Sequence, residues 1–483
     1  MLKKKYIILA VFPVVAAMTG CSKLEDFGDT NLNPAGTNTP ILGALLTNVI
    51  SNLGNNISST RAGLYGQYFS ETQYTDVSLY SLPLLNFNSD GGGNEYSGSL
   101  YDLQNIRNTN TSKNMSAVAK ILQQYTYWTM TDRWGDIPYS EALKGNGTPK
   151  FDTQEAIYKG MIQALKEAVG EFDNTSVITG DVLYNGDAGK WKKFANSLRM
   201  LMSLRLAKRY PGASEYAATE FKAALSDPAG NISSNEDNLV MRFPGGAPAN
   251  FKNPWFNTYD GRKDYAESKT MTDILTAFND NRANIYGGAS EVPGSTTPST
   301  VGMPYGLTRA KSEAFTGANP TWAKILRGDH REITDASVII GASQVLLARA
   351  QAADMGWTTE NTALLYQQGI TASFQQWGLT APAASYFTQT GVALGAPGTN
   401  KDEIAIQRWI AAYPDGIQGW SIWRETGFPV LTPAPDAVNS SKQIPRRYVY
   451  GNGEYSTNPD NTKEAATRMG GDTQDTRVWW DKN

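Results

Sequence analysis

The chain contains one cysteine, Cys21, and this limits how any fold of it can be held together. A single thiol cannot form a disulfide within the chain, so the fold must be stabilised by packing and hydrogen bonds. Cys21 follows lysines at positions 3–5, an apolar run over residues 6–17 and a short segment, 18–20. A charged segment followed by an apolar one and a short link is typical of a signal peptide.

We predict that residues 1–20 are a lipoprotein signal peptide and that Cys21 carries the lipid after cleavage. The apolar run is too short to span a bilayer, which takes about 20 residues. Two or three acyl chains, at about 0.8 kcal/mol per buried methylene, anchor a protein stably. Residues 21–38 have little apolar content and are predicted to be a flexible tether. The alternative is an ordinary secretory signal in which the cysteine stands by chance.

Composition excludes several classes of function. A net charge of −3 argues against nucleic-acid binding, which needs a basic face. The only histidine, His330, excludes a multi-histidine metal site, and its polar surroundings indicate a solvated or capping residue rather than a catalytic one. No Walker loop, GxSxG or HExxH motif is present, so we predict no enzymatic activity, no cofactor and no metal.

Apolar residues recur at helical spacing along much of the chain. The clearest segments are 118–128, 157–172, 191–201 and 366–377. Thr39 and Pro40 predict the start of a first helix, and Asp152 predicts the start of another. Glycine and alanine within residues 337–353 predict a helix that packs closely against the next one, 361–378.

Between these helices lie long segments without periodicity, rich in Gly, Pro, Asn and Ser. They cover residues 74–99, 228–265, 286–320 and 429–483. Loops of this length are functional or disordered, and their aromatic content predicts order. We therefore predict a mainly α fold in one domain, 39–483, with tetratricopeptide-like helical pairs, large irregular loops and few short strands.

Four motifs carry a family resemblance. They are YWTMTDRWGDIPYSEAL (127–143), KDEIAIQRWIAAYPDGIQGWSIWRETGFPVL (401–431), IPRRYVYGNGEYSTNPDN (444–461) and RVWWDKN (477–483). Together with the lipidation signal, these motifs resemble the SusD/RagB family in its SusD-like branch. The resemblance spans nearly the whole chain.

The resemblance implies a nutrient-binding lipoprotein of the outer membrane that faces the cell surface. Such a protein captures a glycan or a peptide and delivers it to a SusC-type TonB-dependent transporter. It also implies a protein without catalytic activity. Two alternatives remain open at this point, a hydrolase that acts on glycans and a structural lipoprotein that holds a membrane complex together.

Two aromatic and polar loops are the candidate ligand-binding surfaces, because aromatic faces stack on sugar rings while polar groups bond to hydroxyls. The candidates are Tyr74, Tyr80 and Phe87 in one loop, and Trp255 and Tyr259 in the other. The alternative interpretation is that these rings pin the loops to the helical body.

Three tryptophans of the family motifs, Trp134, Trp420 and Trp423, lie within helix and turn patterning. We expect them to pack in the core rather than bind ligand. The segment 235–238 carries oxygen ligands that calcium could use, but its spacing lacks the glycine of an EF-hand loop, so we predict no metal there.

Overall fold

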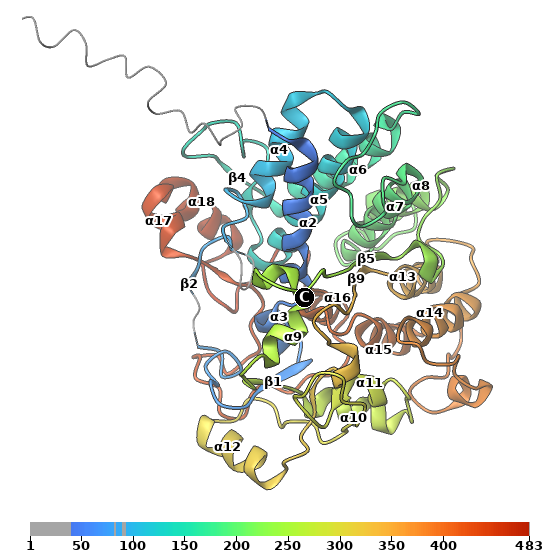
Figure 1. The fold of residues 1–483 in the computed structure, drawn as a ribbon. Helices are drawn as coiled ribbons and strands as arrows, with labels where there is room; N and C mark the ends of the chain where they lie inside the picture. The colour runs from blue at the N-terminus through green and yellow to red at the C-terminus, as the bar shows by residue number, and fades with distance from the viewer. Residues whose placement is uncertain (1–39, 82–83, 89–92, 483) are drawn as a thin grey trace, which may run out of the picture. The chain divides into compact units, whose positions relative to one another are not determined.

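The computed structural model describes residues 40–81, 84–88 and 93–482. Cys21, the predicted signal peptide, the tether and Thr39 lie outside these residues. From Leu42 onward the chain forms one compact unit that is mainly helical (Figure 1). The predicted mainly α fold is confirmed.

The helices follow each other along the chain with short strands between them. They are α2 (Leu42–Ile57), α3 (Thr60–Tyr65), α4 (Ser99–Thr109), α5 (Lys113–Trp134), α6 (Gln154–Glu171), α7 (Ala188–Arg205), α8 (Tyr216–Leu225), α9 (Pro254–Tyr259), α10 (Lys269–Ala277), α11 (Ala283–Tyr286), α12 (Arg309–Ala318), α13 (Ala342–Asp354), α14 (Thr362–Gln376), α15 (Lys401–Ala411), α16 (Gly416–Thr426), α17 (Asn452–Thr457) and α18 (Pro459–Met469). Within the described residues, short 3-10 helices join them, and these are η2 (Asn235–Asp237), η3 (Ala249–Phe251), η4 (Gly328–His330) and η5 (Ala384–Thr388).

Consecutive helices pack as pairs, as the tetratricopeptide-like pattern predicts. Helices α4 to α8 each contact the next one, and α13 packs on α14 and α15 on α16 (Figure 1). The α13–α14 pair is held at close range by Gly369, where an added Cβ would lie 2.7 Å from Cγ of Leu347. The small residue is therefore what allows the two helices to approach.

Two helix starts differ from the sequence prediction. Thr153, not Asp152, caps α6, and its hydroxyl accepts from the Ala156 amide. The Asp152 carboxylate instead accepts from the amides of Tyr139 (3.1 Å) and Ser140 (2.7 Å) in the turn after α5. The first helix begins at Leu42 rather than directly after Pro40.

The segment 337–353 is also not one helix. Its first residues form β9 (Ser337–Ile340), which pairs antiparallel with β5 (Leu239–Met241), and α13 begins only at Ala342. The run of β-branched residues in β9 favours a strand, and Gly341 separates it from the helix.

The strands form five two-stranded sheets in the described residues. Antiparallel pairs join β1 (Phe69–Glu71) to β6 (Tyr265–Glu267), β3 (Ile137–Pro138) to β4 (Phe151–Asp152), β5 to β9, and β7 (Gly287–Gly288) to β8 (Lys324–Ile325). A parallel pair joins β10 (Val449–Tyr450) to β2 (Leu84–Leu85). The segments predicted to be aperiodic contain additional short helices, α9, α12, α17 and α18.

A buried carboxylate, Asp132 of α5, sits where the family motifs meet. Its Oδ1 accepts from the Trp480 indole at 2.9 Å and also from the Tyr158 hydroxyl. Its Oδ2 lies 3.4 Å from the Ser421 hydroxyl and 3.7 Å from Nε of Arg205. Segments far apart in sequence are thus connected through the carboxyl group of Asp132.

The motif tryptophans pack in the core, as expected. Trp134 is fully buried, and its ring meets Phe87 and Tyr448 edge-on, with centroids 5.4 and 5.3 Å away. Trp420 stacks on Tyr448 at 5.5 Å, and Trp423 is also buried. The structural interpretation of these three residues is confirmed.

We expect Trp134→Ala to lower the free energy of unfolding by about 3–5 kcal/mol, because the substitution leaves a large cavity in a packed core. Urea unfolding followed by circular dichroism measures this. Tyr101→Ala, at a ring that is 55% exposed on α4, is the control and should change stability by no more than about 0.5 kcal/mol. Equal effects of the two substitutions would contradict the structural role of Trp134.

Candidate functional site

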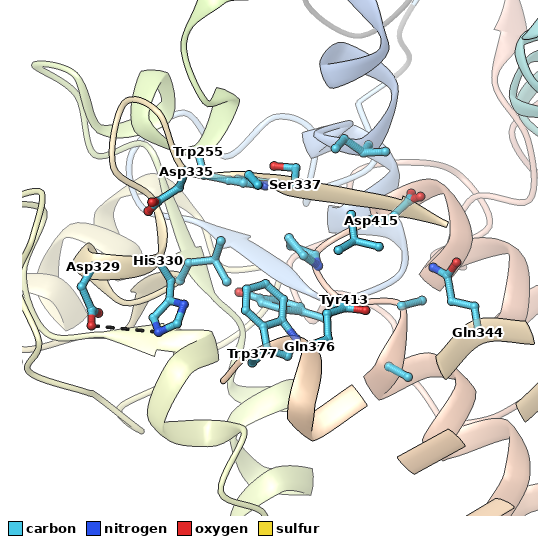
Figure 2. Close-up of a pocket in the computed structure, with 17 residues that line it drawn as sticks. Trp255, Asp329, His330, Asp335, Ser337, Gln344, Gln376, Trp377, Tyr413 and Asp415 are labelled. Carbon is cyan, nitrogen blue, oxygen red and sulfur yellow. Dashed lines mark ion pairs between the residues drawn. The ribbon is translucent and has the colours of Figure 1, made fainter. Parts of the chain in front are cut away.

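A cavity of about 220 Å³ lies where the ends of several elements meet. Figure 2 shows Asp329 and His330 on one side of it, Gln344 and Asp415 on the other, and Trp377 and Gln376 along a third. The turn between α15 and α16 contributes residues 411–415. No single stretch of sequence makes this site.

Three aromatic rings give the cavity fixed apolar faces. Trp377, directly after α14, meets His330 edge-on at 6.0 Å and Tyr286 edge-on at 5.6 Å. Tyr413 stacks on Tyr286, with the ring centroids 4.3 Å apart. Trp255 packs on the ring of Phe69. The rings are thus held by neighbours and not by a ligand.

The polar groups of the cavity are partly paired with the protein. The Asp329 carboxylate accepts from Arg327 at 2.6 and 2.8 Å, and Asp335 accepts from the Glu332 amide at 2.6 Å. The buried Oε1 of Gln376, however, has no hydrogen-bond partner among the described residues. This oxygen is enclosed by the protein, next to Gly341, so it costs free energy but is not open to the cavity.

His330 presents a neutral ring to this cavity. Burial lowers its pKa, and the nearby Arg327 lowers it further, whereas Asp329, 4.0 Å away, acts in the opposite sense. A neutral imidazole has one donor and one acceptor nitrogen. The polar sequence around His330 predicts a solvated or capping residue, whereas the structure places it half-buried on the cavity wall.

Asp415 is the one fully buried carboxyl of the cavity lining, and it caps α16. Burial raises its pKa to about 7, although the amides of Gln418 and Ile417 favour the charged form. Together the fixed rings, the amides and the mixed donors and acceptors suit one uncharged polar ring with apolar faces, such as a pyranose. The volume is below the ~300–1,000 Å³ of pockets for larger ligands.

Four of the five predicted ligand residues lie in the core, and they are Tyr80, Phe87, Trp255 and Tyr259. The Tyr80 hydroxyl accepts from the Ala434 amide at 2.9 Å, Phe87 packs on Trp134, and the Tyr259 hydroxyl bonds to the backbone of Tyr265 and Ile325. These contacts favour the alternative interpretation, in which the rings pin the loops. Ligand contact by Tyr80, Phe87 and Tyr259 has no support from their positions.

Trp255 and Tyr74 face different sites. Trp255 lines the cavity, whereas Tyr74 is 55% exposed on the surface. Pairing of β1 with β6 brings the two predicted loops together, and Arg262 lies 5.9 Å from the Tyr74 ring, with Arg309 at 5.7 Å. Tyr74 and Arg262, one from each candidate loop, thus meet at the surface, whereas the buried rings do not.

Sequence reasoning missed Trp377, Gln376 and His330 as one site. Trp377 fits the apolar face of its helix, and the polar stretch around His330 gives no sign of its neighbours. The segment 235–238, considered for calcium, forms η2, where Lys193 pairs with Asp237 at 2.9 Å. None of the helices in the described part of the chain has the length and apolar character that crossing a membrane requires.

Comparisons with known proteins give a consistent result. The profile of a SusD-like family, described as "Starch-binding associating with outer membrane", matches residues 34–451. A search of curated protein sequences found no match.

Several solved structures share the fold. A chitin-binding SusD homologue from Flavobacterium johnsoniae is 23% identical, with a TM-score of 0.80, over 92% of this chain and 99% of that one. A chitin-binding protein is 27% identical, with a TM-score of 0.75, over 92% of this chain and 100% of that one. A SusD homologue from Bacteroides uniformis is 26% identical, with a TM-score of 0.74, over 92% and 99%.

We expect Asp415→Asn to flatten the pH dependence of stability. The unfolded chain releases this proton near pH 4 and the folded chain near pH 7, so the folded state binds more protons between these values and loses stability as pH rises through this window. From pH 5 to 8 the free energy of unfolding should therefore fall by about 2–3 kcal/mol less in the variant than in the wild type. Urea unfolding at the two pH values measures this.

Asparagine is also a good helix cap, so the substitution preserves the start of α16. The matched control is Asp187→Asn, the same change at the solvent-exposed cap of α7. An identical pH dependence in the wild type and Asp415→Asn would show that the Asp415 carboxyl does not titrate in this range.

Proposed function

Because the chain belongs to the SusD/RagB family, in its SusD-like branch, we propose that it captures a glycan and holds one sugar ring of it in the cavity of Figure 2. The family assignment confirms the resemblance found in the sequence. The family description names starch binding, and two proteins of the same fold are described as chitin-binding.

The observation that carries this proposal is the combination of fixed aromatic faces with a polar lining. Trp377 offers an indole face, and Ser337, Gln344 and His330 line the same cavity. A sugar ring has apolar faces for the indole and hydroxyls for the polar groups, whereas a purely apolar ligand would leave those groups unpaired. A neutral His330 adds a donor and an acceptor without a charge.

We expect Trp377→Ala to weaken binding of the glycan by tenfold or more, because the indole is the largest half-exposed face of the cavity. Calorimetry of the soluble chain with chitin and starch oligosaccharides measures this. Trp479→Ala, at another half-buried tryptophan outside the cavity, is the control and should leave affinity unchanged.

The two alternatives give different outcomes in the same experiment. Chromatography of the oligosaccharides after incubation detects a hydrolase by shorter products, which this proposal does not expect. Failure of the folded wild-type chain to bind any glycan would favour a structural lipoprotein instead.

We also propose that the protein is held at the outer membrane by lipid on Cys21 and delivers its glycan to a SusC-type TonB-dependent transporter. The support is the signal-like N-terminus and the outer-membrane association in the family description. A binding protein that passes its ligand on needs only moderate affinity, because a ligand held too tightly would be released too slowly.

Cys21→Ala should release the protein from membranes, because acylation at this residue is the proposed source of membrane affinity. Fractionation of cells that lack the proposed SusC-type transporter measures membrane retention without the contribution of that partner. Labelling with a palmitate analogue should mark the wild type and not the variant. Retention of the unlabelled variant in the membrane fraction would contradict lipid anchoring.

A further inference from the structure

We infer that further sugar units of the same glycan bind in a second site, an asparagine-rich groove beside the cavity. This inference rests on the proposed function. The groove has a volume of about 430 Å³ and is lined by side chains of α2, η3 and α9, among them Asn52, Asn55, Asn250, Asn257 and Thr258. We call it the asparagine groove.

The groove and the cavity use neighbouring residues of the same helices. On α9, Pro254 faces the groove while Trp255 faces the cavity. At the end of α2, Ser58 lines the groove while Ile57 lines the cavity. The two sites therefore lie beside each other, on different sides of the same two chain segments.

The groove carries the chemistry of a neutral polyol site. Its polar lining consists of amides and hydroxyls, with one lysine, Lys252, that pairs with Asp260 at 3.3 Å. No carboxylate is among the described residues that line it, so the lining offers little to a cation. Amides and hydroxyls both donate and accept, which matches sugar hydroxyls that also do both.

Three of its amides are held in place by the protein. Nδ2 of Asn52 donates to the Asn48 carbonyl at 3.1 Å, that of Asn250 to the Ser51 hydroxyl at 3.0 Å, and that of Asn257 to the Ala249 carbonyl at 2.9 Å. In each case the amide nitrogen is engaged. The three Oδ1 atoms have no donor among the residues that the structure describes, so they are fixed acceptors for ligand hydroxyls.

The floor of the groove is apolar and closely packed. Phe243 lies beneath it with 4% of its surface exposed, and an added Cβ at Gly54 would lie 3.2 Å from the Phe243 ring. A side chain at this position would press on the ring, so glycine is what allows α2 to pack closely on Phe243.

The volumes of the two sites indicate how much of the ligand each can hold. The cavity, at about 220 Å³, accommodates about one ring, whereas the groove falls within the ~300–1,000 Å³ of pockets that hold larger ligands. A glycan of several units must therefore place most of its length outside the cavity. The groove is the neighbouring surface whose chemistry fits that length.

The length of the oligosaccharide provides the test. The probes are the dimer and the hexamer of chitin or starch, whichever series the wild type binds. Their affinities are measured for the wild type, for the groove variant Asn55→Ala/Asn257→Ala and for the control Asn48→Ala on the same helix as Asn55. We expect the wild type to bind the hexamer at least tenfold more tightly than the dimer. The groove variant should lose this difference, while its dimer affinity and its melting temperature stay unchanged.

Hydrogen exchange gives a second readout that needs no variant. Amides of residues 249–258 should be protected by the hexamer and not by the dimer. Equal affinity of the wild type for both lengths, or an unchanged hexamer affinity in a folded groove variant, would overturn the groove. Dimer binding that is unaffected by Trp377→Ala would instead overturn the cavity, so the two failures are distinguishable.

Discussion

The buried carboxylate of Asp132 is the interaction on which the rest of the structure depends. It accepts hydrogen bonds from Tyr158 of α6, Trp480 of the C-terminal segment and Ser421 of α16, and Arg205 of α7 lies beside it. A buried charge is tolerated only when such partners surround it, and removing one of them is costly because the charge stays behind. The need to satisfy one carboxylate therefore gives a physical reason why motifs at 127–143, 401–431 and 477–483 occur together in this chain.

The same charge network fixes the position of the cavity. Arg205 also lies 3.1 Å from Glu425, and Glu425 in turn pairs with Arg408 at 2.6 Å, which ties α16 to α15. The turn between these two helices carries Tyr413 and the residues beside it, which form one wall of the cavity. This wall of the cavity is thus tied to a buried network of ion pairs.

The sequence predicts what depends on local spacing and leaves unpredicted what depends on distant contacts. The helices around Trp128 and Trp191 follow from their apolar periodicity, and Trp134 follows from its place in a helix-turn pattern. The predicted cap of α6 is one residue too early. Asp152 and Thr153 are both good helix caps, and the sequence does not show that the Asp152 carboxylate bonds to the turn at Tyr139 instead. The cavity cannot be predicted at all, since its residues become neighbours only through the packing of α9, β9 and α14 to α16. A resemblance to a family supplies the fold but not these contacts.

The assembly of the cavity from chain segments near residues 57, 255, 330, 377 and 413 has a consequence for folding. Contacts between such remote segments form late, because closing each long loop costs entropy before the contact returns any free energy. The cavity therefore exists only in chains that have completed their tertiary structure. A ligand that binds there, as proposed above, would stabilise the native state alone and would therefore favour correctly folded copies. The cavity and the complete fold are, for this protein, gained together.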